Sequence, residues 1–311
     1  MSTPTPPGAA LEALLQRADS VLARFESLLP VATAEPDWSA SIAFRYRKRA
    51  GAFGAGARVG VLEPVRHVAP IALDNLKEVD AQKERLRANT AQFVAGRSAN
   101  NVLLTGARGT GKSSLIKACL HEFAPQGLRL IEVDKSDLVD LPDIVDLIDG
   151  RPERFIVYCD DLSFDDGEAG YKALKSMLDG TVSATSDNVL VYATSNRRHL
   201  LPEQMKDNLA ATHDEDGELH PGEAIEEKIS LSERFGLWIT FYPFAQDDYL
   251  AAVERWLAHF RVEKPRSARE AEERTREALQ FALQRGSRSG RVAWQFARHW
   301  AGGLGLEQAG K

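Results

Sequence analysis

Short apolar runs alternate with amphipathic segments through the middle of the chain. Five runs rich in Val, Ile, Leu or Phe occupy residues 101–105, 128–133, 155–159, 188–193 and 237–241. Between them, apolar residues recur with helical spacing, around 137–148, 168–180 and 202–210. Buried strands that alternate with helices are typical of a parallel sheet covered on both faces. The pattern therefore predicts an α/β fold around a five-stranded parallel sheet.

Both ends of the chain follow helical patterns without such strands. Residues 11–29 repeat apolar side chains every three or four positions, after a Pro- and Thr-rich start that we expect to be disordered. After Pro243, helical spacing continues to the end of the chain. We therefore expect three parts: an N-terminal extension with an amphipathic helix and a basic segment at 1–72, an α/β domain at 73–243, and a helical lid at 244–311.

Composition and charge exclude several classes of protein. Of the 311 residues, 43% are apolar and 27% charged, and the net charge is −6, so no global basic field attracts nucleic acid or an anionic membrane. No apolar run reaches the roughly 18 residues that span a bilayer, and the start lacks a signal peptide. Cys119 and Cys159 lie in apolar segments and are expected to be buried, reduced thiols. We expect a cytoplasmic protein without a membrane partner.

The first apolar run ends in a complete phosphate-binding loop of the form GxxxxGK[ST]. Gly106, Gly109 and Gly111 allow a tight turn, whose N–H groups can approach phosphate oxygens at the start of the next helix. Lys112 can reach the β- and γ-phosphates of ATP, and the Ser113 hydroxyl can ligate Mg²⁺. The expected nucleotide contacts are Gly106, Ala107, Arg108, Gly109, Thr110, Gly111, Lys112, Ser113 and Ser114.

The third apolar run ends in two carboxylates, Asp160 and Asp161. Ligands bind at the carboxyl ends of parallel strands, so Asp160 is expected to hold Mg²⁺ opposite Ser113. Asp161 is then the candidate that orients or deprotonates the attacking water. The alternative is an ordinary Asp-Asp turn that ends a strand.

Three further polar residues have positions that suit phosphate chemistry. Asn196 follows the fourth apolar run, where its amide can bond the γ-phosphate or the water. Arg234 precedes the fifth run and can reach a γ-phosphate on a neighbouring subunit. Arg291 starts the last helical segment and can fold back over the nucleotide, a role for which Arg288 is the other candidate. The alternatives are a strand-end amide and ordinary surface arginines.

Residues 45–49 form a basic cluster, with Phe44 and Tyr46 beside the charges. Basic residues interleaved with aromatic ones can contact nucleic acid. A solvated face of a strand or helix is the simpler interpretation. The sequence leaves both open.

Taken in order, these motifs resemble those of AAA+ ATPases over residues 73–301. Gly106–Ser113 corresponds to Walker A, Asp160 and Asp161 to Walker B, Asn196 to the first sensor, Arg234 to the arginine finger and Arg291 to the second sensor. Segments 86–93, 100–114 and 227–238 look like signatures of a bacterial ATP-binding family of unknown function, domain family eight-one-five. The core also resembles helicase-loader ATPases, through residues 194–197.

The resemblance implies a parallel sheet in the order 5-1-4-3-2 followed by a helical lid. It also implies binding of ATP and Mg²⁺, slow ATP hydrolysis, a homo-oligomer in which Arg234 acts across subunits, and remodelling or loading of a protein or nucleic-acid partner. One position departs from the family pattern: Asp161 stands where most members carry Glu, one methylene longer. That departure favours an alternative, a nucleotide-controlled binding switch with little turnover. A P-loop kinase acting on a small molecule is a further alternative.

Overall fold

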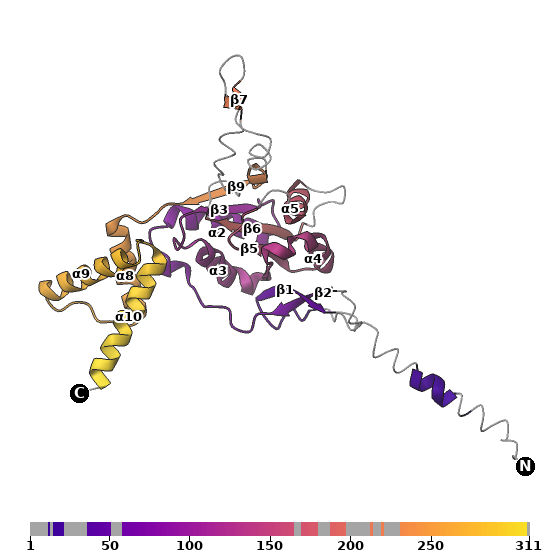
Figure 1. Ribbon diagram of the computed structural model, residues 1–311, viewed down its shortest axis with the longest axis horizontal. Coiled ribbons are helices and arrows are strands. Elements are labelled where there is room, and N and C mark those ends of the chain that lie inside the picture. Colours follow the sequence, from indigo (N-terminus) through magenta and orange to yellow (C-terminus); the bar gives the residue numbers. More distant parts are fainter. Residues whose placement is uncertain are drawn as a thin grey trace, which may run out of the picture.

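The computed structural model of the chain describes residues 12, 15–21, 36–50, 58–164, 169–179, 187–196, 212–213, 219–220 and 231–309. A seven-stranded sheet lies at its centre, in the order β2-β1-β4-β5-β6-β3-β9 (Figure 1). Its strands are β1 (Ala43–Ala50), β2 (Arg58–Pro64), β3 (Val102–Gly106), β4 (Leu128–Glu132), β5 (Arg154–Cys159), β6 (Val189–Ser195) and β9 (Leu237–Phe241).

The five strands that the apolar runs predicted form the parallel core of this sheet. Adjacent core strands all pair in parallel register. Numbered along the chain from β3, their spatial order reads 5-1-4-3-2, which confirms the order that the AAA+ resemblance implied. Their side chains are buried almost throughout, as expected of strands covered on both faces.

Two strands that the apolar pattern did not predict extend the sheet beyond β4. β1 pairs in parallel with β4 and antiparallel with β2, so the sheet is mixed and has seven strands rather than five. The side chains of Phe44 and Tyr46 alternate with basic residues along β1, and both rings are buried. Phe44 packs against Trp38, with ring centroids 4.6 Å apart. This alternation has the two-residue period of a strand, but it covers only residues 44–47, too few to distinguish a strand from a helix.

The basic cluster on β1 is paired with carboxylates of the same chain. Arg45 bonds Glu132 at 2.6 Å, and Lys48 bonds Asp140 at 2.7 Å. Two further pairs join Arg47 to Asp134 and Arg49 to Glu63. Of the two interpretations of residues 45–49, the structure therefore favours the solvated strand face.

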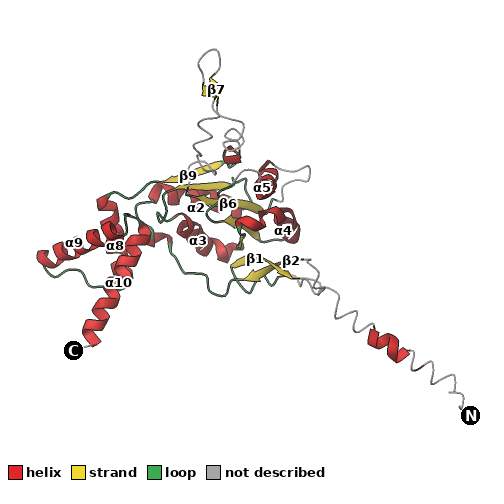
Figure 2. Cartoon of the chain, viewed as in Figure 1, coloured by secondary structure: helices red, strands yellow, loops and turns green. Residues whose placement is uncertain are grey.

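Helices cover both faces of the sheet (Figure 2). One face packs against α2 (Asp80–Val94) and α3 (Lys112–Phe123). The other packs against the 3-10 helix η3 (Lys135–Asp140), α4 (Leu141–Ile148) and α5 (Ala169–Asp179). Two short 3-10 helices, η1 (Leu73–Asn75) and η2 (Ala124–Gln126), connect these elements.

Three C-terminal helices pack around a hydrophobic cluster of their own, as the helical pattern after Pro243 predicted. They are α8 (Gln246–His259), α9 (Ala268–Gln284) and α10 (Gly290–Ala309). They form a separate group beside the sheet (Figure 1). Their inner side chains include Tyr249, Val253 and Phe296, all buried.

Some expected elements lie wholly or largely outside the described residues. The helix expected at 202–210 does, as does most of the amphipathic segment 11–29, of which residues 15–21 are helical and exposed. Two short strands, β7 (Thr212–His213) and β8 (Leu219–His220), pair antiparallel within the acidic segment. Within the described part of the chain, every helix is too short or too polar to cross a bilayer.

Candidate active site

A cleft of about 770 Å³ opens between the carboxyl ends of the core strands and the C-terminal helices. Parallel strands end at one edge of their sheet, so loops that follow β3, β5 and β6 meet there. Side chains from these loops, from the linker before α2 and from the lid line the cleft, and they include Ile71, Lys77, Arg108, Lys112, Ser113, Asp160, Asp161, Thr194, Asn196, Trp256, Arg291 and Trp294.

The glycine turn between β3 and α3 has the conformation that only glycine adopts readily. Gly106, Gly109 and Gly111 have φ angles of 124°, 77° and 104°. A Cβ added at Gly106 would lie 1.9 Å from the carbonyl oxygen of Phe241, so the turn lies directly against β9. The turn then leads into α3, which begins at Lys112. The first N–H groups of this helix have no partner within it, and residues 111–114 line the cleft.

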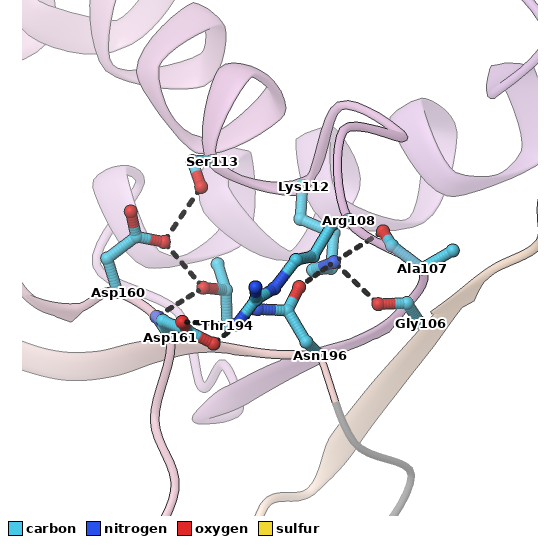
Figure 3. Close-up of polar contacts among 9 residues, drawn as sticks. All are labelled: Gly106, Ala107, Arg108, Lys112, Ser113, Asp160, Asp161, Thr194 and Asn196. Carbon is cyan, nitrogen blue, oxygen red and sulfur yellow. Dashed lines mark hydrogen bonds and ion pairs between the residues drawn. The ribbon is translucent and has the colours of Figure 1, made fainter. Parts of the chain in front are cut away.

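The Lys112 ammonium lies at the centre of the site (Figure 3). It donates to the carbonyl oxygens of Gly106 and Ala107, at 2.7 and 2.8 Å, and to the Asn196 side-chain oxygen at 3.1 Å. Only 6% of Lys112 is exposed. Burial lowers the pKa of Lys112 to about 8, against the opposing effect of the Asp160 and Asp161 carboxylates.

Ser113 and Asp160 face each other across the cleft. The Ser113 hydroxyl donates to Asp160 Oδ1 at 2.8 Å, and the Thr194 hydroxyl donates to the same oxygen at 2.6 Å. Burial acts to raise the pKa of Asp160, but these hydrogen bonds outweigh it and the pKa is lowered. Asp160 is therefore an ionised carboxylate at neutral pH, as a metal ligand must be.

Asp161 is held by two neighbours at the end of β5. Its carboxylate accepts a hydrogen bond from the Asn196 amide and lies 3.6 Å from the Arg108 guanidinium, which extends toward it from the glycine turn (Figure 3). Its own N–H donates to the Thr194 hydroxyl at 2.9 Å. The φ angle of Asp161 is 51°, in the left-handed region that Asp tolerates better than most residues. This backbone turn directs the side chain away from that of Asp160.

Of the two lid arginines, Arg291 is the one that faces the site. Its N–H donates to the Gly109 carbonyl oxygen at 3.0 Å, and its side chain lines the cleft. Arg288 is exposed and is not one of the described residues that line the cleft. A Cβ added at Gly109 would meet the Ser289 hydroxyl at 2.8 Å. The start of α10 and the glycine turn are therefore in direct contact.

Arg234 lies away from this cleft. It follows a short helical turn at 231–233 and pairs with Asp179, the last residue of α5. It is not among the described residues that line the cleft. The structure thus brings together all the predicted site residues except Arg234, and Arg197 of the helicase-loader resemblance lies outside the described residues.

Sequence reasoning missed one wall of the cleft. The linker between β2 and α2 contributes Pro70, Ile71 and Leu76, and the lid contributes Trp256 and Trp294. These residues lie far apart in the sequence and carry no motif, so only the fold brings them together. The contact of Thr194 with Asp160 was also not predicted, although its place at the end of β6, beside β5, is the signal that points to it.

Comparison with known proteins gives one match to a family and several distant structural likenesses. The model of a family described as "Protein of unknown function (DUF815)" matches residues 42–304. No curated protein matches the chain.

Three solved structures illustrate the structural likeness. The RuvB Holliday junction branch migration motor of Thermotoga maritima is 14% identical, with 74% of this chain and 72% of that chain covered and a TM-score of 0.44. The FIGL-1 AAA domain in complex with ADP is 17% identical, with 76% and 75% covered and a TM-score of 0.47. The Aeropyrum pernix ORC1 protein in complex with DNA is 15% identical, with 70% and 57% covered and a TM-score of 0.46. Likenesses at this distance do not bear on activity.

Proposed function

The chain belongs to the family described as protein of unknown function (DUF815), and from the geometry of its cleft we propose that it is a Mg²⁺-dependent ATPase. It binds ATP between the glycine turn and the end of β5, and hydrolyses it to ADP and phosphate. The observation that carries the proposal is the 2.8 Å contact between Ser113 and Asp160, beside the buried Lys112 ammonium.

The Ser113–Asp160 pair fits a magnesium ion. Mg²⁺ takes oxygen ligands at about 2.0–2.1 Å in octahedral geometry, so two adjacent ligand oxygens lie about 2.9 Å apart. The observed separation is 2.8 Å, and one carboxylate with one hydroxyl is a typical protein share of a Mg-ATP site. Bound Mg²⁺ supplies positive charge to the β- and γ-phosphate oxygens. The low pKa of Asp160 keeps its carboxylate ionised for this role.

The rest of the cleft suits a nucleoside triphosphate. The N–H groups of residues 106–114 cradle the phosphates, and Lys112 leaves its carbonyl partners to bind the β- and γ-phosphates. Arg291 neutralises phosphate charge from the lid side. The cleft volume of about 770 Å³ is within the usual range for small-molecule sites.

Hydrolysis requires a water molecule aligned with the γ-phosphate. We assign its orientation and deprotonation to Asp161, with Asn196 bonding the γ-phosphate or the water. The Asn196 amide bridges Lys112 and Asp161, so it lies between the phosphate-binding cation and the candidate base. We assign Arg234 to the nucleotide of a neighbouring subunit, which makes the active form a homo-oligomer.

We further propose that turnover drives the remodelling or loading of a protein or nucleic-acid partner in the cytoplasm. The contact between Arg291 and Gly109 supports a coupling of this kind. The lid touches the phosphate-binding turn, so nucleotide binding at the turn moves the lid, and the partner responds to that movement. The two cysteines are buried free thiols, as suits a reducing compartment.

One observation favours a second candidate, a nucleotide-controlled binding switch with little turnover. The Asp161 side chain is shorter than Glu and is already engaged by Asn196 and Arg108. A carboxylate held in this way aligns water less well. In that case ATP still closes the lid, and a partner reads the lid position.

Steady-state phosphate release from Mg-ATP separates the two candidates. For the ATPase, the wild-type rate of phosphate release per chain rises with protein concentration, because Arg234 acts across subunits. Asp161→Asn lowers kcat by at least about 100-fold while leaving ATP affinity within about twofold. Glu63→Gln, which removes a partly exposed carboxylate that is not among the described residues lining the cleft, is the matched control and leaves turnover unchanged. Equal and low rates for wild type and Asp161→Asn would instead support the switch.

A further inference from the structure

Arg234 lies at the edge of the sheet opposite the phosphate-binding turn. β3 and β9 run in parallel, with Val102 beside Leu237. The glycine turn follows the carboxyl end of β3, whereas Arg234 precedes the amino end of β9. A five-residue strand is about 17 Å long, so Arg234 is separated from its own cleft by roughly that distance. Arg234 therefore does not reach the nucleotide site of its own chain.

The carboxylate of Asp179 reaches Arg234 at that same edge. α5 connects β5 to β6, two parallel neighbours, so the helix runs back and ends at the amino edge. Asp179 is its last residue, and its carboxylate accepts a hydrogen bond from Arg234 Nε. The exposed fractions are 23% for the Arg234 side chain and 43% for Asp179, so the pair is partly accessible to solvent.

The backbone around Arg234 is fixed by packing. Leu231 and Phe235 are buried in the same hydrophobic cluster as Leu174 of α5. The Trp238 indole donates to the Ser232 carbonyl oxygen at 2.8 Å. Packing therefore sets the position of the Arg234 Cα, and the carboxylate of Asp179 holds the Nε of its side chain.

We propose that Asp179 is the positioning residue that aims the Arg234 guanidinium at the nucleotide of a neighbouring subunit. The inference rests on the proposed ATPase function. A guanidinium carries five N–H donors in a rigid plane, so a bond through Nε restrains the orientation of the whole fork. An arginine held in advance loses less conformational freedom in the transition state than one that must be ordered.

The test is the effect of Asp179 on kcat and its dependence on Arg234. Asp179→Asn is expected to lower kcat by about 10- to 100-fold, the cost of a misaligned catalytic group, with KM within about twofold. Asp179→Glu keeps the carboxylate and recovers part of the rate. In an Arg234→Ala background, Asp179→Asn has no further effect. Glu63→Gln again serves as the control for losing a surface ion pair.

A mixing experiment tests the action between subunits. Asp179→Asn chains keep an intact cleft, and Asp161→Asn chains keep an intact Arg234–Asp179 pair. A mixture of the two is expected to turn over ATP faster than the average of the separate preparations.

The outcomes separate this inference from the function on which it rests. Wild-type protein without turnover overturns the ATPase and the inference together. Wild-type turnover that Asp179→Asn leaves unchanged, or that it lowers equally in the Arg234→Ala background, overturns the inference alone.

Discussion

Raising the pH is expected to weaken Mg-ATP binding through the Lys112 ammonium. Burial lowers the pKa of Lys112 to about 8, although the nearby Asp160 and Asp161 carboxylates oppose the shift. Without nucleotide, the ammonium contacts neutral oxygens of Gly106, Ala107 and Asn196. A triphosphate brings negative charge beside the ammonium, so the pKa in the complex is higher than in the free protein.

The size of the effect follows from the pKa of about 8 for Lys112. In the free protein, Lys112 is charged in about 90% of molecules at pH 7 and in about 10% at pH 9. When the complex keeps the lysine charged, the apparent Kd rises about tenfold between these pH values. This corresponds to a loss of about 1.4 kcal/mol of binding free energy. Each ATP bound at pH 8 takes up about half a proton. The pKa of Asp160 is lowered and those of Cys119 and Cys159 are raised to about 12, so these groups do not titrate in this window.

Isothermal titration calorimetry at pH 7, 8 and 9, in two buffers of different ionisation enthalpy, measures both quantities. Lys112→Arg is the control, because its guanidinium stays charged throughout and its affinity should not vary with pH. A wild-type Kd that is constant from pH 7 to 9, or a binding heat at pH 8 that is the same in both buffers, would refute the reasoning.

Three further results are expected. Gly106→Ala destabilises the fold by at least about 1–3 kcal/mol, because the added Cβ has no space and the φ angle of Gly106 is 124°. Gly302→Ala, in an open stretch of α10, instead stabilises the fold by about 0.5–1 kcal/mol. Thermal melts of the two variants measure the difference. Phe44→Ala costs about 3–5 kcal/mol in denaturant unfolding if β1 belongs to the main core, and a loss under 1 kcal/mol would argue against that. Thr194→Val removes a donor to Asp160 and raises the Mg²⁺ concentration needed for half-maximal ATP binding, and an unchanged magnesium titration contradicts the role given to that bond.

The parallel core and the phosphate-binding turn could be predicted because their signals are local. A buried strand reads as an apolar run, and all five runs are strands within a residue or two of the expected bounds. The glycine turn requires its residue types at fixed spacing, and Ser113 and Asp160 meet because parallel strands end at one edge.

What the sequence did not predict depends on contacts between distant segments. For the basic segment of β1 the sequence left a solvated face and a nucleic-acid contact open, because the carboxylates that pair with it lie on β4, η3 and β2. The wall formed by Pro70, Trp256 and Trp294 has no motif, because each residue merely presents an apolar surface where the fold brings it. The pairing of Arg234 with Asp179 likewise spans 55 residues and follows from the return of α5 to the amino edge.

The most direct test of the account is the binding of Mg-ATP to the protein at pH 7. Calorimetry is expected to find one nucleotide per chain, with an affinity that drops when magnesium is chelated and that loses its magnesium dependence in Asp160→Asn. A folded protein that gives no binding heat, or that binds ATP equally well with and without Mg²⁺, would contradict the claim that Ser113 and Asp160 hold the metal beside Lys112.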